Sequence, residues 1–291
     1  MTGQQRNLIR AAAVFLFGHI ENRILMNPAI PGTVAVLVYL AAAAVQFAGM
    51  SRGTEGSKTW IPVMATIAVT CHALTLYMDL FGPQGVNLGL FPMLSLMAVS
   101  IVGLIVLNSF RQPVDNLFII VFPIAAVTVV LELLAPANLQ PRSDLSGGII
   151  GHIILSVMAY SLLTIAALQA AMLSFGDYEL RQRNLSVLKR LPPLQTMESL
   201  LFETLWVGLV FLTLSIATGF VFITDFAGPG IVHHTVITMA AWVVFAVLIW
   251  GRYQLGWRGA VASRWALSGF VILVIGYFGS KLVLEVILGR V

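Results

Sequence analysis

Four of the five histidines lie inside or at the edge of long apolar stretches of this sequence: His72, His152, His233 and His234. An ionisable side chain within a bilayer is costly, so each one is by default a candidate for function. Neutral imidazole is a common metal ligand and the usual ligand of haem iron, and two imidazoles from different helices can hold one haem in an apolar cleft. Taken singly, each histidine also has a structural interpretation, because a membrane histidine often only hydrogen-bonds to a neighbouring helix.

The composition defines the surroundings of these histidines. Hydrophobic residues make up 59% of the chain, charged residues only 10%, and the mean hydropathy is +0.95. Such a chain has too few polar side chains to cover a soluble globule, so we predict an all-α polytopic membrane protein whose solvent is the lipid bilayer. The net charge of +4 comes from loop arginines, which indicate membrane orientation rather than a nucleic-acid partner. The single cysteine, Cys71, excludes an internal disulfide and a c-type haem attachment motif.

Apolar segments separate clearly from residue 30 onward, and each is long enough to cross a hydrocarbon core as a helix. We predict a bundle of about eight transmembrane helices at residues 30–48, 61–80, 88–107, 117–135, 147–174, 197–224, 234–251 and 262–288. Residues 1–25 differ, because their apolar core of about a dozen residues is too short to span. We interpret residues 1–25 as an N-terminal extension, either an interfacial helix or an artefact of start-site choice, and residues 26–291 as the membrane domain.

The connecting loops predict the orientation. Lysine and arginine concentrate in the loops after the first, third, fifth and seventh predicted spans, whereas the alternate loops contain only Arg142. Positive residues are retained on the cytoplasmic side, so both termini should face outward. This orientation puts all four histidines in the outer half of the membrane, on three different helices. His72 lies just beyond the middle of the second span, His152 opens the fifth, and His233 and His234 open the seventh.

Charged residues at the same level can support a bound cofactor. A histidine ligand usually donates its other ring nitrogen to a carboxylate or a carbonyl, which would give Asp79 or Asp225 a role. Haem propionates require a cation, which would give Lys281 or Arg142 a role. Lys281 can instead pair with Glu285, four residues later on the same helix. Glu132 and Asp144 also lie on this side.

Elsewhere the sequence offers little chemistry. It has no Walker loop, GxSxG elbow, HExxH motif or dinucleotide fingerprint, which argues against a hydrolase or a phosphate-binding enzyme. Glu198 and Glu203 open the sixth predicted span, where the helix dipole favours carboxylates, so we expect a structural role for both.

Four stretches resemble the cytochrome c assembly protein family, and within it the small eight-helix branch of the YpjD and HemX type. They are GVNLGLFPMLSLMAVS after the second span, HIILSVMAYSLLTIAALQA in the fifth, LPPLQTMESLLFETLWVGLVFLTLSIATGF in the sixth, and the region from WGRYQLGWRG to GYFGSKLVLEVIL. The resemblance implies a bacterial inner membrane protein that holds or presents haem b at the outer, periplasmic face during cytochrome c assembly, without turning over a substrate. Its implied partners are apocytochrome c or other membrane assembly subunits.

The resemblance also implies roles for individual residues. His72, His152 and His233 match the family's histidines, which would make them the axial ligands. His234 ranks below His233, because its place is often lysine in the small branch. The larger members carry a tryptophan-rich WGxxWxWD segment where this chain has only TDFAGPGIVHH, so the resemblance implies haem binding more directly than haem delivery.

Two other functions stay open at this point. Pro62, Pro92 and Pro123 interrupt predicted helices, as prolines often do in transporters, so a small-solute or haem permease is one alternative. A structural membrane subunit without a cofactor is the other.

Overall fold

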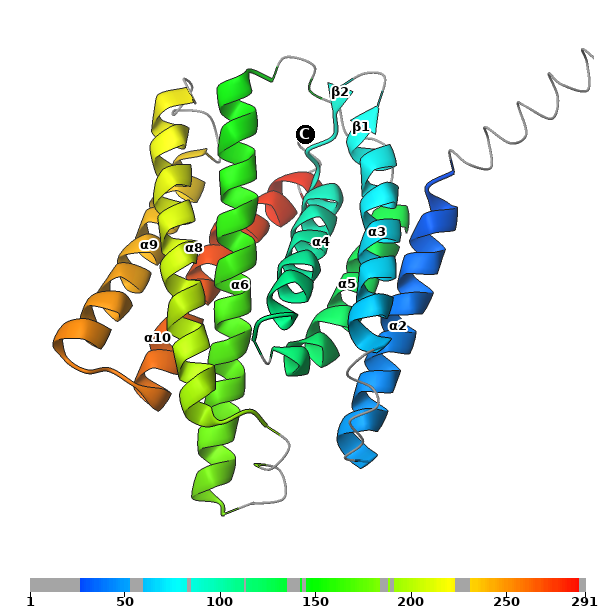
Figure 1. Ribbon diagram of the computed structural model, residues 1–291. Coiled ribbons are helices and arrows are strands. Elements are labelled where there is room, and N and C mark those ends of the chain that lie inside the picture. The colour runs from blue at the N-terminus through cyan, green and yellow to red at the C-terminus, as the bar shows by residue number, and fades with distance from the viewer. Residues whose placement is uncertain are drawn as a thin grey trace, which may run out of the picture.

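A computed structural model describes residues 27–52, 60–82, 85–112, 114–134, 142, 145–183, 188, 191–222 and 231–287. Within these residues the chain forms a bundle of eight α-helices, which confirms the all-α prediction (Figure 1). The predicted extension at residues 1–25 lies outside the described residues.

The helices follow the predicted spans closely. They are α2 (Ala29–Arg52), α3 (Trp60–Leu80), α4 (Leu90–Ser109), α5 (Phe118–Leu134), α6 (Gly147–Arg181), α8 (Leu194–Phe222), α9 (Ile231–Gln254) and α10 (Gly259–Val274). Seven are long and apolar enough to cross a membrane, α10 together with the turn that follows it, and α5 is the shorter exception with 17 residues. A helix of that length covers about 26 Å, slightly less than a typical hydrocarbon core of about 30 Å. A 3₁₀ turn, η2 (Asp115–Leu117), precedes it.

The last predicted span is not one regular α-helix. After α10 the chain continues through two π-helical segments, η3 (Ile275–Gly279) and η4 (Leu282–Ile287). The Ser280 hydroxyl donates to the carbonyl oxygens of Gly276 (2.6 Å) and Tyr277 (3.0 Å), so it competes with the backbone N–H groups for these acceptors. Gly276 also packs directly on α9, because a Cβ there would lie 2.9 Å from Cγ2 of Ile237. Both interactions favour a widened turn, a feature that is frequent at functional sites.

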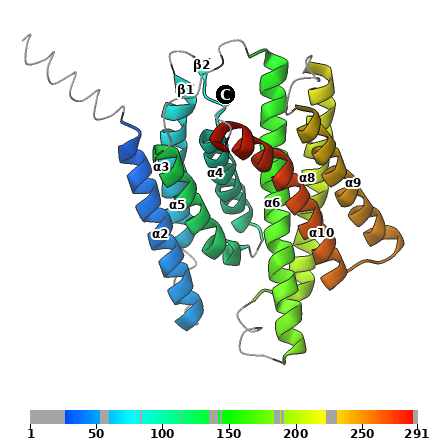
Figure 2. The same ribbon diagram turned by 180° about the vertical axis from the view of Figure 1, so that it is seen from behind.

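The helices form two halves, each with its own hydrophobic core. Helices α2 to α5 enclose the N-terminal core, in which Phe118 and Phe122 stack at 4.7 Å between ring centroids. Helices α6, α8, α9 and α10 enclose the C-terminal core. There α6 and α8 approach closely at Gly208, where a Cβ would lie 2.9 Å from Cδ2 of Leu163. Helices α4 and α6 contact each other and join the halves, as the view from behind shows (Figure 2).

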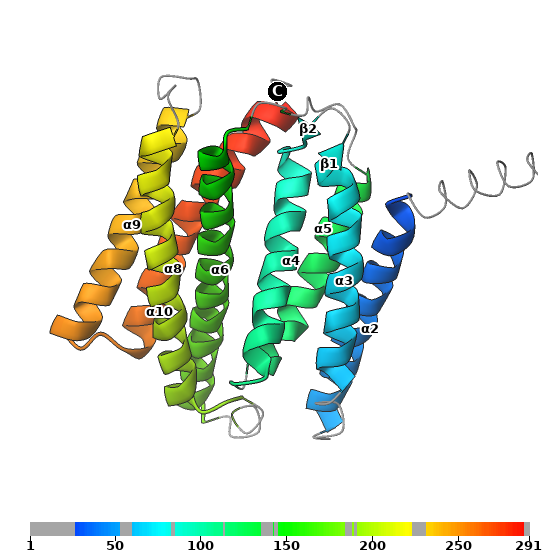
Figure 3. The same cartoon turned by 45° about the horizontal axis from the view of Figure 1, so that its top comes forward.

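One end of the bundle holds the starts of α2, α6 and α9 and the last described turn of the chain, coloured red (Figure 3). We call it the outer end, after the orientation that the sequence predicts. A small antiparallel hairpin of β1 (Phe81–Gly82) and β2 (Gly85–Val86) lies there, and Val86 also exchanges backbone hydrogen bonds of 3.0 Å with Arg142. The end of α6, with Arg181, and the region from the last turn of α9 to the start of α10, with Arg252 and Arg258, lie at the opposite, inner end.

Glu198 anchors the inner end. Its carboxylate is buried and accepts hydrogen bonds from Nη1 of Arg252 (2.6 Å), Nε of Arg258 (2.9 Å) and the backbone N–H of Gly259 (3.2 Å). Gly259 has a φ of +50°, a conformation that glycine adopts without strain, and this turns its N–H toward the carboxylate. Glu198 therefore does more than complement the dipole of α8, because it ties this helix to the turn between α9 and α10.

We expect Glu198→Ala to destabilise the protein by about 2 kcal/mol, because hydrogen bonds to a charged acceptor are among the stronger ones and two arginines would lose their counter-charge. Thermal unfolding of the purified protein in mild detergent measures the effect. Glu203→Ala is the matched control, since Glu203 is exposed and, within the described residues, accepts one side-chain hydrogen bond, from Gln112. Equal unfolding temperatures for the two variants would contradict the anchoring role.

Candidate functional site

The structure divides the histidines between the two halves. His72 lies on α3 in the N-terminal half, whereas His152 on α6 and both His233 and His234 on α9 lie in the C-terminal half. Helices α4 and α6 separate α3 from α9 (Figures 1 and 2). The structure therefore does not bring His72 together with His152 and His233 in one cleft.

His72 is fully buried in a chain of hydrogen bonds that crosses four helices. Its Nδ1 lies 3.2 Å from the hydroxyl of Tyr39 on α2, and its Nε2 lies 2.7 Å from the hydroxyl of Ser95 on α4. Ser95 donates in turn to Oε2 of Glu132 on α5. We call these four residues the buried chain. Both ring nitrogens of His72 are engaged in it, so neither is available to a metal without breaking a hydrogen bond.

His152 has one engaged ring nitrogen and one with a lone pair. Its Nδ1 lies 2.9 Å from the carbonyl oxygen of Ser215 on α8. A carbonyl can only accept, so Nδ1 carries the proton and Nε2 retains its lone pair. Metal-binding histidines typically show this arrangement, in which a hydrogen bond at one nitrogen orients the ring and leaves the other free. Ser156 and Ser215 hydrogen-bond at 2.7 Å and hold α6 and α8 together beside the ring.

His234 faces the protein, whereas its neighbour His233 is exposed. The His234 ring packs edge-on against Tyr277, with 5.6 Å between centroids. Its Nε2 is buried and has no hydrogen-bond partner among the described residues. His234 also lies within electrostatic range of His152 and Lys281. The ranking that the resemblance implied, His233 above His234, is thus the reverse of their burial.

Lys281 completes this arrangement from the π-helical region. Its ammonium donates to the carbonyl oxygen of Leu88, in the segment before α4, and lies 5.7 Å from the centroid of the Tyr277 ring. We call His152, His234, Tyr277 and Lys281 the outer histidine group. The alternative pairing of Lys281 with Glu285 falls on a side chain outside the described residues.

The other predicted polar partners do not join this group. Asp79 is partly exposed near the end of α3 and interacts electrostatically with Glu132 in the N-terminal half. Arg142 is exposed and pairs with Val86 through its backbone. Asp144 and Asp225 lie outside the described residues. In the part of the chain that is described, no three His, Cys, Asp or Glu side chains gather as a metal centre would require.

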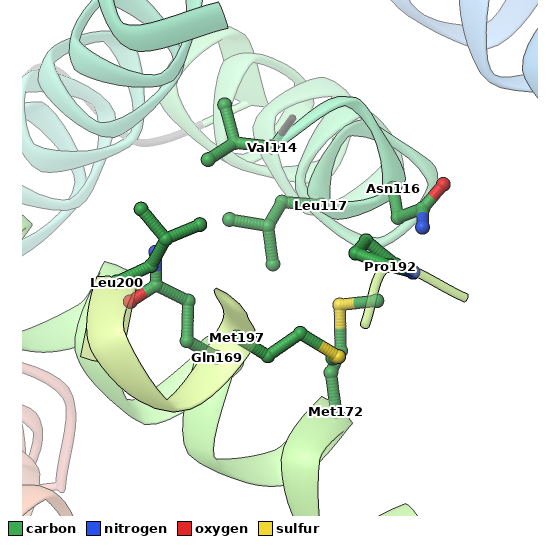
Figure 4. A pocket seen from close by; sticks show the side chains of 8 residues that line it. All are labelled: Val114, Asn116, Leu117, Gln169, Met172, Pro192, Met197 and Leu200. Atoms are coloured by element: carbon green, nitrogen blue, oxygen red, sulfur yellow. The ribbon is translucent and has the colours of Figure 1, made fainter. Parts of the chain in front are cut away.

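A small cavity of about 20 Å³ lies at the inner end, away from the histidines (Figure 4). Gln169 of α6 faces it with a buried amide whose nitrogen and oxygen both lack a hydrogen-bond partner among the described residues. The volume suits about one water molecule, which would satisfy that amide. The lining residues are Val114, Asn116, Leu117, Gln169, Met172, Pro192, Met197 and Leu200.

The sequence analysis did not identify several residues at these sites. Ser95 and Gln169 are polar residues within apolar runs, a signal that could have singled them out. Tyr39 and Tyr277 carry no such signal, because aromatic side chains are common in membrane helices.

Comparison with known proteins agrees with this architecture. The family model of the cytochrome C assembly protein matches residues 60–288. The inner membrane protein YpjD of Escherichia coli strain K12 is 31% identical over 255 residues, which cover 87% of this chain and 97% of that protein. The protein HemX of Brevibacillus brevis is 24% identical over 211 residues, or 68% of this chain and 78% of its own length. No solved structure matches the chain. With eight helices, seven of membrane-spanning length, and a match over most of its residues, this chain belongs to the cytochrome c assembly protein family.

Proposed function

We propose that this protein is a haem-binding component of cytochrome c assembly in the bacterial inner membrane, and that His152 and His234 would hold the haem iron. The observation that supports this most is the buried Nε2 of His234, which lacks a partner in the described structure and lies within electrostatic range of His152. A buried nitrogen without a hydrogen bond is costly, and a ligand at this position would offset that cost.

Three features of the outer histidine group support binding of an iron porphyrin. Two imidazoles come from separate helices, α6 and α9, and would hold one iron between them. The hydrogen bond from His152 Nδ1 to the Ser215 carbonyl orients the ring and leaves Nε2 as the donor atom. Lys281 would supply a positive charge for a propionate, and it lies 5.7 Å from the centroid of the Tyr277 ring, which packs in turn against Phe278. Bound haem would supply a redox-active iron.

The position of this group supports a role at the periplasmic face. The group lies at the end of the bundle opposite the arginine-rich turns, and positive turns are retained in the cytoplasm. Haem held there would be within reach of an apocytochrome c or of another assembly subunit on the outer side. The protein would in this way hold or present haem without catalysing a reaction of its own.

The first prediction concerns the ligands. Purified protein supplemented with haem should show a Soret band and a bis-histidine reduced-minus-oxidised spectrum. His152→Ala and His234→Ala should each weaken haem binding by at least about tenfold, or about 1.4 kcal/mol, because each removes one iron ligand. Haem titration followed by absorbance gives the affinities.

Two further variants serve as controls for this experiment. His233→Ala removes an exposed neighbour of His234 and should leave the spectrum and the affinity unchanged. His72→Ala should lower the unfolding temperature, because it breaks two buried hydrogen bonds, but should preserve the spectrum. If the wild type binds no haem, the proposal fails and a structural subunit without a cofactor is the better description.

The second prediction concerns Lys281. Lys281→Met should lower the affinity for haem by about tenfold, because a charge-assisted contact to a propionate is lost. Haem dimethyl ester, which has no negative propionates, should bind the wild type and this variant equally. Arg142→Met is the matched control and should bind both porphyrins as the wild type does. Equal losses of Lys281→Met for haem and for the ester would show that Lys281 acts on the fold instead.

A further inference from the structure

The buried chain of Tyr39, His72, Ser95 and Glu132 is not used by the proposed haem site. Glu132 is only 5% exposed, near the outer end of α5. One carboxyl oxygen, Oε2, accepts a hydrogen bond from Ser95, and the other, Oε1, is buried without a partner among the described residues. No ion pair found within the described residues involves Glu132; two of these pairs join Glu198 to Arg252 and Arg258.

The groups that face Glu132 do not offset a negative charge. Asp79 on α3 interacts with it electrostatically and is itself an acid. Further along the chain are His72, Tyr39 and, beside Tyr39, Cys71, none of which is a permanent cation. An ionised carboxylate with one hydrogen bond in this apolar core would cost several kcal/mol, whereas a protonated carboxyl would cost much less.

We propose that Glu132 is a proton-binding site that communicates with the outer end of the bundle through Asp79 and with the interior through the buried chain. Glu132 takes up the proton and becomes a carboxylic acid. This reverses the direction of the hydrogen bonds along the buried chain and so changes the tautomer of His72.

The chain can exist in two arrangements that differ by one proton. With Glu132 ionised, Ser95 donates to Oε2, so it must accept from Nε2–H of His72, and Nδ1 accepts from the hydroxyl of Tyr39. With a proton on Oε2, Glu132 donates to Ser95, Ser95 donates to Nε2, and His72 donates from Nδ1–H to the oxygen of Tyr39. In the second arrangement one proton has been taken up: Glu132 holds a proton that it did not hold before, neutral His72 has exchanged Nε2–H for Nδ1–H, and Tyr39 keeps its own hydroxyl proton, which no longer points at His72.

The positions of these residues give the proton a path that opens only at the outer end of the bundle. Asp79 is partly exposed at the outer end, Glu132 lies within electrostatic range of it, and Ser95 and His72 follow deeper in the bundle. The chain ends at Tyr39, which is fully buried and packs on Phe122. A proton therefore enters and leaves by the outer side and does not cross the membrane.

Infrared spectroscopy of the full-length protein in lipid nanodiscs tests the proposal. At neutral pH we expect the C=O stretching band of a protonated carboxylic acid, shifted by D₂O and by ¹³C-glutamate labelling, which identifies glutamate without any substitution. The band should be absent in Glu132→Gln and unchanged in Glu203→Gln. Ser95→Ala should shift it to higher frequency, because the carboxyl loses its hydrogen bond.

Nitrogen NMR of ¹⁵N-histidine-labelled wild type, assigned with His72→Gln, provides a second and independent measurement. As the pH is raised and the infrared band is lost, His72 should change from the Nδ1–H to the Nε2–H tautomer and stay neutral. Three results would overturn the proposal: no protonated glutamate band in the wild type at neutral pH, an undiminished band in Glu132→Gln, or a His72 tautomer that does not follow the band.

Discussion

Moving a polar side chain from water into the interior of a bilayer costs several kcal/mol of free energy unless another group in the protein forms a hydrogen bond with it. In this bundle that requirement decides which helices are held together. Tyr39, His72, Ser95 and Glu132 come from four different helices, and each finds its partner on a neighbouring one. At the inner end, Glu198 joins three segments of the C-terminal half in the same way. The apolar side chains fill the space between the helices, and these polar contacts specify how the helices are arranged.

The histidines of the two halves satisfy this requirement to different degrees. In the N-terminal half both nitrogens of His72 have partners, so the ring is fixed as part of the packing. In the C-terminal half Nε2 of His234 has none within the described residues, and the regular helix gives way to a π-helical turn next to it. A buried polar group without a partner beside irregular backbone is typical of a ligand site rather than of packing. For this reason we place the proposed cofactor in the C-terminal half, although His72 is the most deeply buried histidine within the described residues.

Sequence patterns predicted the fold well, because apolar runs of about 20 residues have one stable form in a bilayer. The bounds of α2 to α9 agree with the predicted spans to within a few residues at most ends; the main exception is the inner end of α6, which continues to Arg181. The pattern could not predict the π-helical region after Val274, since that depends on Ser280 and on the contact of Gly276 with α9.

For the candidate site, the sequence predicted the depth of the histidines in the membrane but not which side chains meet. Position along a helix follows directly from the sequence, so His152 and His234 could be assigned to the same level. The direction of a side chain depends on how helices rotate against each other, and successive residues differ by about 100°. His233 and His234 show the consequence: they lie at the same depth, but one is exposed and the other faces Tyr277. Partners such as Tyr39 and Ser95 are far away in the sequence, so only the packing of the helices reveals them.

Lys281 connects the two halves at the outer end. This contact links the outer histidine group to helix α4, which also carries part of the buried chain. It belongs to the C-terminal half, yet its ammonium bonds to the carbonyl of Leu88, just before the first turn of α4. Helix α4 carries Ser95, the residue that joins His72 to Glu132. A propionate that drew Lys281 away would leave the Leu88 carbonyl without this donor, and the start of α4 would be less constrained. Occupation of the histidine group and the proton on Glu132 would then affect each other through α4, with no direct contact between the two sites.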